Sequence, residues 1–151
     1  MTYLRRLQQA HRIEVNGEAT YAAAARWTRS PDHRAKWRAL ADLETRMKGR
    51  VAAEIVALGR VAAERGLDIW TGRAIGTVVA ALPWRIMLRG LRLVTRHTTR
   101  FWQRLEVEHT GGNARLLADL TAHERAQVEF AERELYGESN GSLEPVLALL
   151  S

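Results

Sequence analysis

The chain has no cysteine among its 151 residues. Disulfide bonds, thiolate metal sites and catalysis by a cysteine nucleophile are therefore excluded. Proline is scarce, with three residues, and no run of alternating apolar and polar residues predicts a β-strand. Ala, Leu, Arg and Glu dominate instead, and their propensities favour helices. The sequence therefore predicts an all-α protein.

No apolar stretch is long enough to cross a membrane. The longest stretch without a charged residue covers residues 74–84, whereas a membrane-spanning helix needs about 20 apolar residues. A secretory signal is not expected either, because Arg5, Arg6 and Arg12 interrupt the N-terminal region. Glycine-rich phosphate loops, nucleophile elbows and catalytic triads are also missing. We expect one domain over residues 1–151 and a cytoplasmic location, with peripheral contact to the inner face of a membrane left open.

Positive charge is concentrated in one part of the chain. The formal net charge is +6, yet residues 69–105 contain seven arginines and no acid, whereas residues 106–151 contain nine acids and three arginines. One interpretation is a solvated helix face, partly paired with acids of the following helix. Others are contact with an anionic membrane surface and, least favoured because no recognition motif accompanies the charge, binding of nucleic acid. Six of the arginines recur at helical spacing, opposite the apolar stripe of the predicted helix: Arg85, Arg89, Arg92, Arg96, Arg100 and Arg104.

Two tryptophans flank the apolar segment that precedes this arginine row. Trp70 and Trp84 border residues 74–84, and aromatic, apolar and basic residues together are typical of a segment that lies in a membrane interface. We therefore predict membrane contact at these two side chains.

Turn residues divide the chain into long predicted helices. Ser30-Pro31-Asp32, Gly66, Pro83, Gly111-Gly112 and Gly137 mark the ends. The predicted helices cover residues 3–29, 33–65, 113–136 and 143–150, together with a third segment that opens at Trp70. This third segment has a bend or break near residues 80–83, and its main part covers residues 83–109. Short connections between long helices predict an antiparallel four-helix bundle with a short C-terminal helix.

Glutamates interrupt the apolar stripes of three predicted helices near their centres. Glu18, Glu44 and Glu124 each occupy an inward position, and a buried carboxylate is costly unless it is paired, hydrogen-bonded or bound to metal. Counting from the turn near residue 31 places Glu18 and Glu44 at the same height in an antiparallel pair. The pattern therefore predicts a polar pocket inside the bundle, in which Glu14, one turn before Glu18, is an alternative.

Three short motifs resemble the ligand motifs of the ferritin-like di-iron proteins, such as the rubrerythrins and the demethoxyubiquinone hydroxylases. The motifs are Gly17-Glu18-Ala-Thr-Tyr21, Leu43-Glu44-Thr-Arg-Met47 and His123-Glu124-Arg-Ala-Gln127. The resemblance implies a ferritin-like four-helix bundle, a paired iron or manganese centre, and an apolar inter-helix segment that contacts membrane. The sequence departs from the pattern at Met47 and Gln127, which replace histidines, and at Thr98, which replaces a bridging glutamate.

These departures lead to three functional hypotheses. The first is a ferritin-like protein with an incomplete di-metal site, which acts by binding a membrane surface, an apolar ligand or a protein partner. The second is an active di-iron oxidoreductase or hydroxylase with non-standard ligands, and the third is a basic helical nucleic-acid binder. A homodimer is expected by analogy. The candidate metal ligands are Glu18, Glu44, His123 and Glu124, and the other predicted pocket residues are Glu14, Tyr21, Met47, His97, Thr98 and Gln127.

Overall fold

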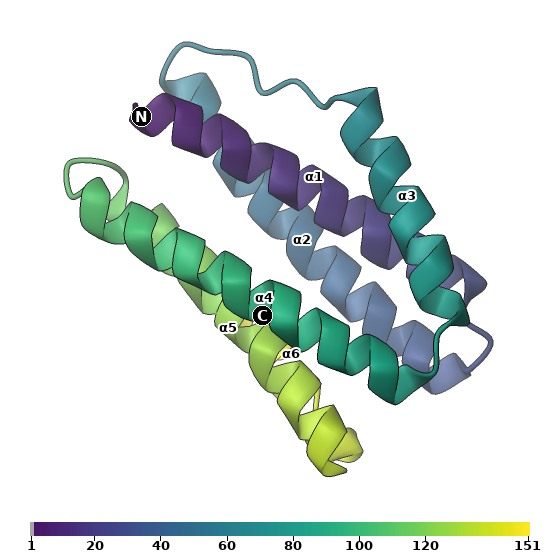
Figure 1. Cartoon of the computed structure of the whole chain (residues 1–151). Helices are drawn as coiled ribbons and strands as arrows, with labels where there is room; N and C mark the ends of the chain where they lie inside the picture. The colour runs from purple at the N-terminus through teal and green to yellow at the C-terminus, as the bar shows by residue number, and fades with distance from the viewer. Residues whose placement is uncertain (1) are drawn as a thin grey trace. The chain divides into compact units, whose positions relative to one another are not determined.

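The structure is a computed structural model that describes residues 2–151. Helices make up most of this part of the chain, which contains no strand (Figure 1), so the all-α prediction is confirmed. The chain divides into two compact units, Met1–Ala81 and Leu82–Ser151, which are described separately. The helices are α1 (Tyr3–Trp27), α2 (Pro31–Ala57), α3 (Gly66–Ala81), α4 (Trp84–Glu108), α5 (Ala114–Tyr136), a 3-10 turn η1 (Ser139–Gly141) and α6 (Glu144–Leu150).

The first unit is built around α1, which packs against both α2 and α3. Ser30 accepts a hydrogen bond from the His33 amide and so caps α2, and Pro31 follows it where no amide donor is needed. In the core, the ring of Tyr21 stacks on that of Trp37 at 5.5 Å. The largest aliphatic residues of this core are fully buried: Leu7, Leu40, Leu43, Val51 and Ile55.

Two glycines hold α3 close to α1. A Cβ at Gly72 would lie 2.5 Å from the Asn16 carbonyl oxygen, and one at Gly76 would lie 2.1 Å from that of Thr20. Both distances are too short for any other residue, so the Gly72-x-x-x-Gly76 spacing lets the two helix backbones touch. The Asn16 amide strengthens this contact, because it donates to the Asp68 carbonyl and the Thr71 hydroxyl, both at 3.0 Å.

The second unit pairs α4 with α5, and α6 packs on α5. Asn113 caps α5 by accepting from the Leu116 amide, and Gly137 ends it in the left-handed conformation, with φ of 87°. The largest apolar residues of this unit are fully buried: Leu88, Trp102, Leu105, Leu117, Leu120 and Phe130.

The structure changes the predicted ends of two helices. The predicted helix 33–65 ends at Ala57, and residues 58–65 form a connector in which Gly59 has φ of 73°. Gly66, which the sequence suggested as a helix end, begins α3 instead. The predicted bend near residues 80–83 is a complete break at residues 82–83, between α3 and α4.

The buried face of α4 is rotated from the predicted one by about one residue. Thr98, a predicted pocket residue, is partly exposed, whereas Leu88 and Trp102 are fully buried. Trp102 is fully buried and donates through Nε1 to Glu124 of α5, so its indole belongs to the face of α4 that packs on α5. None of the described helices combines the length and the apolar character that crossing a membrane requires.

Candidate metal-binding site

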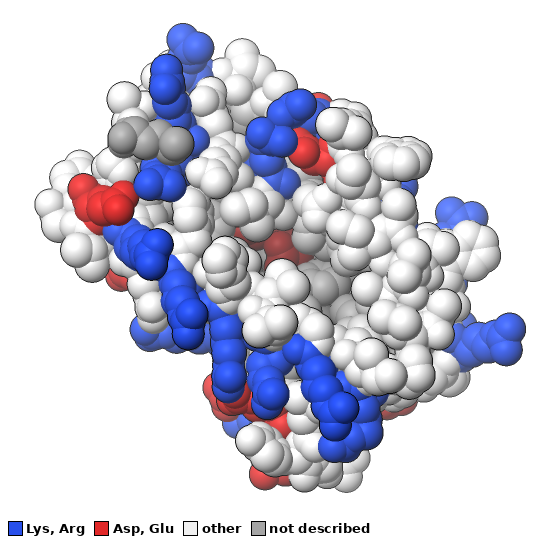
Figure 2. All heavy atoms as spheres, in the orientation of Figure 1, with Lys and Arg blue, Asp and Glu red and all other residues white. Residues whose placement is uncertain are grey.

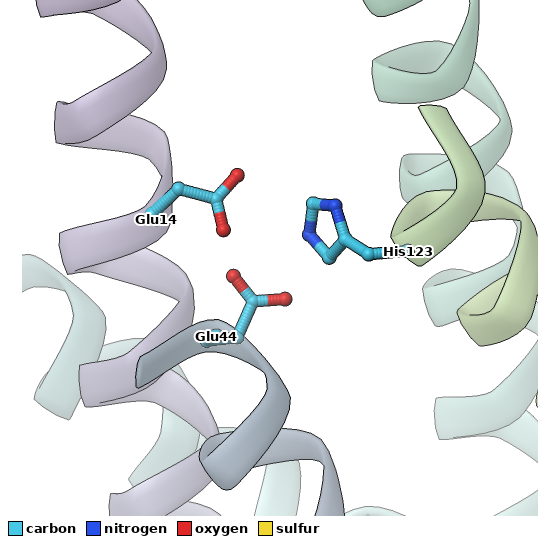
Figure 3. A group of neighbouring side chains, drawn as sticks. All are labelled: Glu14, Glu44 and His123. Carbon is cyan, nitrogen blue, oxygen red and sulfur yellow. The ribbon is translucent and has the colours of Figure 1, made fainter. Parts of the chain in front are cut away.

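Glu14 and Glu44 form a buried carboxylate pair in the first unit. Glu14 extends from α1 and Glu44 from α2, and Figure 3 shows the two carboxylates pointing toward one another. Their exposed fractions are 0% and 4%, and one oxygen of each lies within 4.8 Å of the other. This distance is short enough for one cation to contact both carboxylates.

Gly17 provides the space for the Glu44 side chain. A Cβ at this position would lie 2.6 Å from Glu44 Oε2 and 3.0 Å from its carboxyl carbon. Any larger residue in place of Gly17 would therefore displace the carboxylate. The absence of a side chain at residue 17 keeps Glu44 against α1, within reach of Glu14.

The electrostatics of the pair favour a positive species nearby. Two like charges that are buried a few ångströms apart repel strongly, because the protein interior screens them less than water does. The repulsion is relieved when a proton is shared or when a cation lies between the carboxylates. Carboxylate oxygens are hard donors, which suit Mn²⁺, Fe²⁺ or Mg²⁺.

Glu18, the predicted ligand on α1, lies one turn further along and has other partners. Its carboxylate accepts hydrogen bonds from Thr45 Oγ1 at 2.6 Å and from Lys48 Nζ at 2.8 Å. Lys48 also pairs with Glu64 at 2.7 Å. Burial alone would lower the pKa of Lys48, but its hydrogen bonds to Glu18 and Glu64 outweigh burial and raise that pKa. The structure thus places Glu18 in an ion-pair network and Glu14 beside Glu44.

His123 and Glu124 belong to a second polar cluster, in the second unit. Both are on α5, with exposed fractions of 0% and 4%. His123 Nδ1 lies 2.8 Å from the Leu120 carbonyl oxygen, so in the neutral ring Nδ1 carries the proton and Nε2 has the lone pair. Metal-binding histidines commonly have this arrangement. Glu124 accepts a hydrogen bond from Trp102 Nε1 at 3.3 Å.

The two residues that replace the expected histidines are buried. Met47 is 3% exposed on α2, and Gln127 is 1% exposed on α5. A thioether is a soft ligand and an amide is a weak neutral one, so neither replaces imidazole beside carboxylates. Tyr21, another predicted pocket residue, is buried against Trp37.

On α4 the polar residues that point inward are not the predicted ones. Thr98 is partly exposed and donates to the Val94 carbonyl of its own helix at 3.1 Å, and His97 is exposed. Thr95 and Thr99 are buried instead, with exposed fractions of 3% and 9%. The sequence signal that could have identified them is their spacing of seven and three residues to Trp102, a large apolar residue in the second half of the helix.

The arginine row follows the outer side of α4. Figure 2 shows basic side chains in a line over this helix. Five of the six are exposed, and Arg92 is partly exposed. Arg96 pairs with Glu132 of α5, whereas the other five have no hydrogen bond or ion pair within residues 2–151. The predicted pairing with acids of the following helix is therefore limited to Arg96.

The two tryptophans predicted to contact membrane differ in environment. Trp70 is 68% exposed on α3, and Leu67 and Val78 of the same helix are 58% and 63% exposed. Trp84 is partly exposed, and its Nε1 donates to Glu134 Oε2 at 2.8 Å. Trp70 is therefore exposed on a helix that also exposes Leu67 and Val78, while the indole of Trp84 has a hydrogen-bond partner inside its own unit.

No family model matches the chain, and comparison with curated proteins and with solved structures also gives no match. The resemblance to ferritin-like di-iron proteins therefore depends on the sequence motifs alone and stays a prediction.

Proposed function

We propose that the protein binds a divalent transition-metal ion through Glu14 and Glu44, and that it acts by binding with little or no catalysis. The observation that carries the proposal is the pair of buried carboxylates with oxygens within 4.8 Å of each other. Gly17 supports it, because a side chain there would close the space that Glu44 occupies. The hard oxygen donors favour Mn²⁺ or Fe²⁺.

The absence of histidine at residue 47 supports the non-catalytic part of the proposal. A di-iron centre of the ferritin-like type uses a Glu-x-x-His motif, and here the residue three positions after Glu44 is Met47. Loss of an imidazole ligand lowers affinity for iron and leaves fewer groups to hold a second metal. The sequence-based prediction that His123 and Glu124 supply further ligands stays a prediction, as does the ferritin-like bundle.

Metal analysis of the purified protein tests this proposal. We expect bound manganese or iron after growth in medium supplemented with these metals. Glu14→Gln and Glu44→Gln should lose most of the bound metal, whereas Glu18→Gln should retain it. The last variant is the matched control, since Glu18 is a glutamate on α1 that pairs with Lys48. Equal metal content in Glu44→Gln and in the unmodified protein would contradict the proposal.

Metal stoichiometry and stability separate the alternatives. Two metals per chain together with oxidase or hydroxylase activity would support the di-iron enzyme hypothesis instead. If the two carboxylates share a proton and bind no metal, added Mn²⁺ does not raise the melting temperature.

A second candidate function is contact with an anionic membrane surface, which the apolar surface of α3 favours. Leu67, Trp70 and Val78 lie on this helix with more than half of each side chain exposed. Exposed aromatic and aliphatic residues of this kind insert into the headgroup region, and nearby basic residues attract anionic lipids. Flotation with phosphatidylglycerol vesicles at low salt tests this candidate. We expect binding that Trp70→Ser abolishes and that Trp27→Ser, at another exposed tryptophan, leaves intact.

A further inference from the structure

A hollow in the first unit lies one turn of α1 before the carboxylate pair. Its volume is about 580 Å³, within the range of small-molecule sites. The N-terminal half of α1 forms one wall, and the connector 58–65 forms the other. Ile55, at the end of α2, lies between them and is 1% exposed.

His11 is the buried polar residue of this hollow. Its side chain lines the hollow and is 3% exposed, yet it makes no hydrogen bond or ion pair with the residues that the structure describes. Buried polar side chains nearly always have a hydrogen-bond partner, so this imidazole is suited to a partner from outside the chain. Burial lowers the pKa of His11, so the ring is neutral near pH 7 and offers one donor and one acceptor.

The rim of the hollow is positively charged. Arg5 on α1 and Arg65 on the connector both line it and are exposed, and their guanidinium groups make no hydrogen bond or ion pair in the described part of the chain. Arg12 lines it too, but its charge is compensated by Asp68 at 3.1 Å. Arg12 lowers the pKa of Asp68 through its hydrogen bond, and the charge of Arg65 adds to this effect at longer range. Guanidinium groups that lack a direct ion pair favour a carboxylate or phosphate, which each can bind through two parallel hydrogen bonds.

Gln8 and Gln9 of α1 add amide groups to the hollow, whereas its surface on the connector side is apolar. Ile55 contributes a buried aliphatic side chain, and Val61 on the connector is 82% exposed. Ala62 and Ala63 continue this surface without adding polar groups. A ligand that fits this combination has an oxyanion at one end and an apolar body at the other.

We propose that this hollow binds a small amphiphilic oxyanion, a carboxylate or phosphate ester joined to an apolar or aromatic body. The oxyanion pairs with Arg5 and Arg65, the body packs on Ile55 and Val61, and His11 hydrogen-bonds a polar atom of the ligand. The site uses none of the residues assigned to the metal, so it is independent of the proposed metal binding.

Titration of the full chain with phenyl phosphate, followed by NMR of the amide groups, tests this proposal. We expect saturable shifts at the hollow, and similar but weaker shifts with benzoate. Arg65→Gln and Arg5→Gln should each weaken phenyl phosphate binding about tenfold or more. Arg60→Gln is the matched control, because Arg60 is an exposed arginine of the same connector that does not line the hollow.

Each part of the proposal has a result that would overturn it. If inorganic phosphate binds as tightly as phenyl phosphate, the apolar body does not contribute to binding. If benzylamine binds as tightly as phenyl phosphate, the site does not recognise an oxyanion. If Arg60→Gln lowers the affinity for phenyl phosphate as much as Arg65→Gln does, the ligand is attracted by the basic surface as a whole and not by the hollow. Unchanged affinity in His11→Gln, checked for folding by its NMR spectrum, would exclude the imidazole from the site.

Discussion

The Glu44 carboxylate lies directly against Gly17: a Cβ on this glycine would be 2.6 Å from Glu44 Oε2. We predict that Gly17→Ala lowers Mn²⁺ affinity about tenfold, equivalent to about 1.4 kcal/mol, because Glu44 must move away from Glu14. Stability without metal should not fall, since the end of a flexible side chain can shift and alanine favours helix by about 1 kcal/mol. Calorimetric titration with Mn²⁺ and urea denaturation measure the two effects.

The control for that substitution is Gly49→Ala on α2. A Cβ at Gly49 would meet no atom within 4 Å, so only the helix propensity changes. We expect unchanged Mn²⁺ affinity and a small gain in stability. Equal affinities of the two variants for Mn²⁺ would show that Gly17 does not position the metal ligand.

The close contact of α3 with α1 gives a prediction for stability. Gly76→Ala places a Cβ 2.1 Å from the Thr20 carbonyl oxygen, and neither backbone can yield without separating the helices. We expect a loss of about 2–3 kcal/mol in the free energy of unfolding, the upper part of the usual range for overpacking. Urea denaturation measures this loss. Gly66→Ala, where a Cβ meets open space, should cost much less.

His11 should make stability depend on pH. Burial lowers the pKa of His11 from its usual 6.5, so the unfolded chain takes up a proton at a higher pH than the folded chain does. Its contribution to stability is complete above about pH 6.5 and is lost as the pH falls toward the lowered folded pKa. We predict that His11→Gln reduces the fall in the free energy of unfolding between about pH 7 and about pH 5.

Denaturation curves at several pH values test the role of His11, with His97→Gln as the control. His97 is exposed on α4, and the pH dependence of this variant should match that of the unmodified protein. If the free energy of unfolding of His11→Gln depends on pH as it does in the unmodified protein, other groups cause the loss of stability in acid.

Lys48 should stabilise the first unit by joining α1 to the connector. Its ammonium lies 2.8 Å from a Glu18 oxygen and 2.7 Å from a Glu64 oxygen, and its side chain is 17% exposed. Lys48→Met keeps the length of the side chain but leaves two carboxylates without their shared cation. We expect a loss of about 2 kcal/mol in urea denaturation. Arg46→Met, at an exposed position of the same helix, should change stability by less than about 0.5 kcal/mol.

The sequence predicts the helices well but not all of their ends. Composition alone extends the second helix to residue 65, because residues 58–65 are rich in Ala, Glu and Arg. The structure ends α2 at Ala57, and Gly59 adopts a positive φ that few other residues accept. Because a glycine can either end a helix or begin one, the sequence does not show whether the second helix ends near Gly59 or at Gly66.

The candidate site shows why a single stripe is an incomplete guide to burial. The pocket residues predicted on α2 and α5 are buried: Glu44, Met47, His123, Glu124 and Gln127. On α1, however, both Glu14 and Glu18 belong to the same predicted stripe. Because α1 packs against α2 and α3 at once, it has two buried faces, and periodicity cannot decide which glutamate reaches Glu44.

The glycine contact of α3 has a consequence for how this protein can change over evolution. The helix attaches to α1 through Gly72 and Gly76, residues without side chains, while Leu67, Trp70 and Val78 remain outside. Substitutions at those outer positions would leave the attachment intact. Natural selection could therefore alter the outer surface of α3 for a new partner while the fold stayed the same.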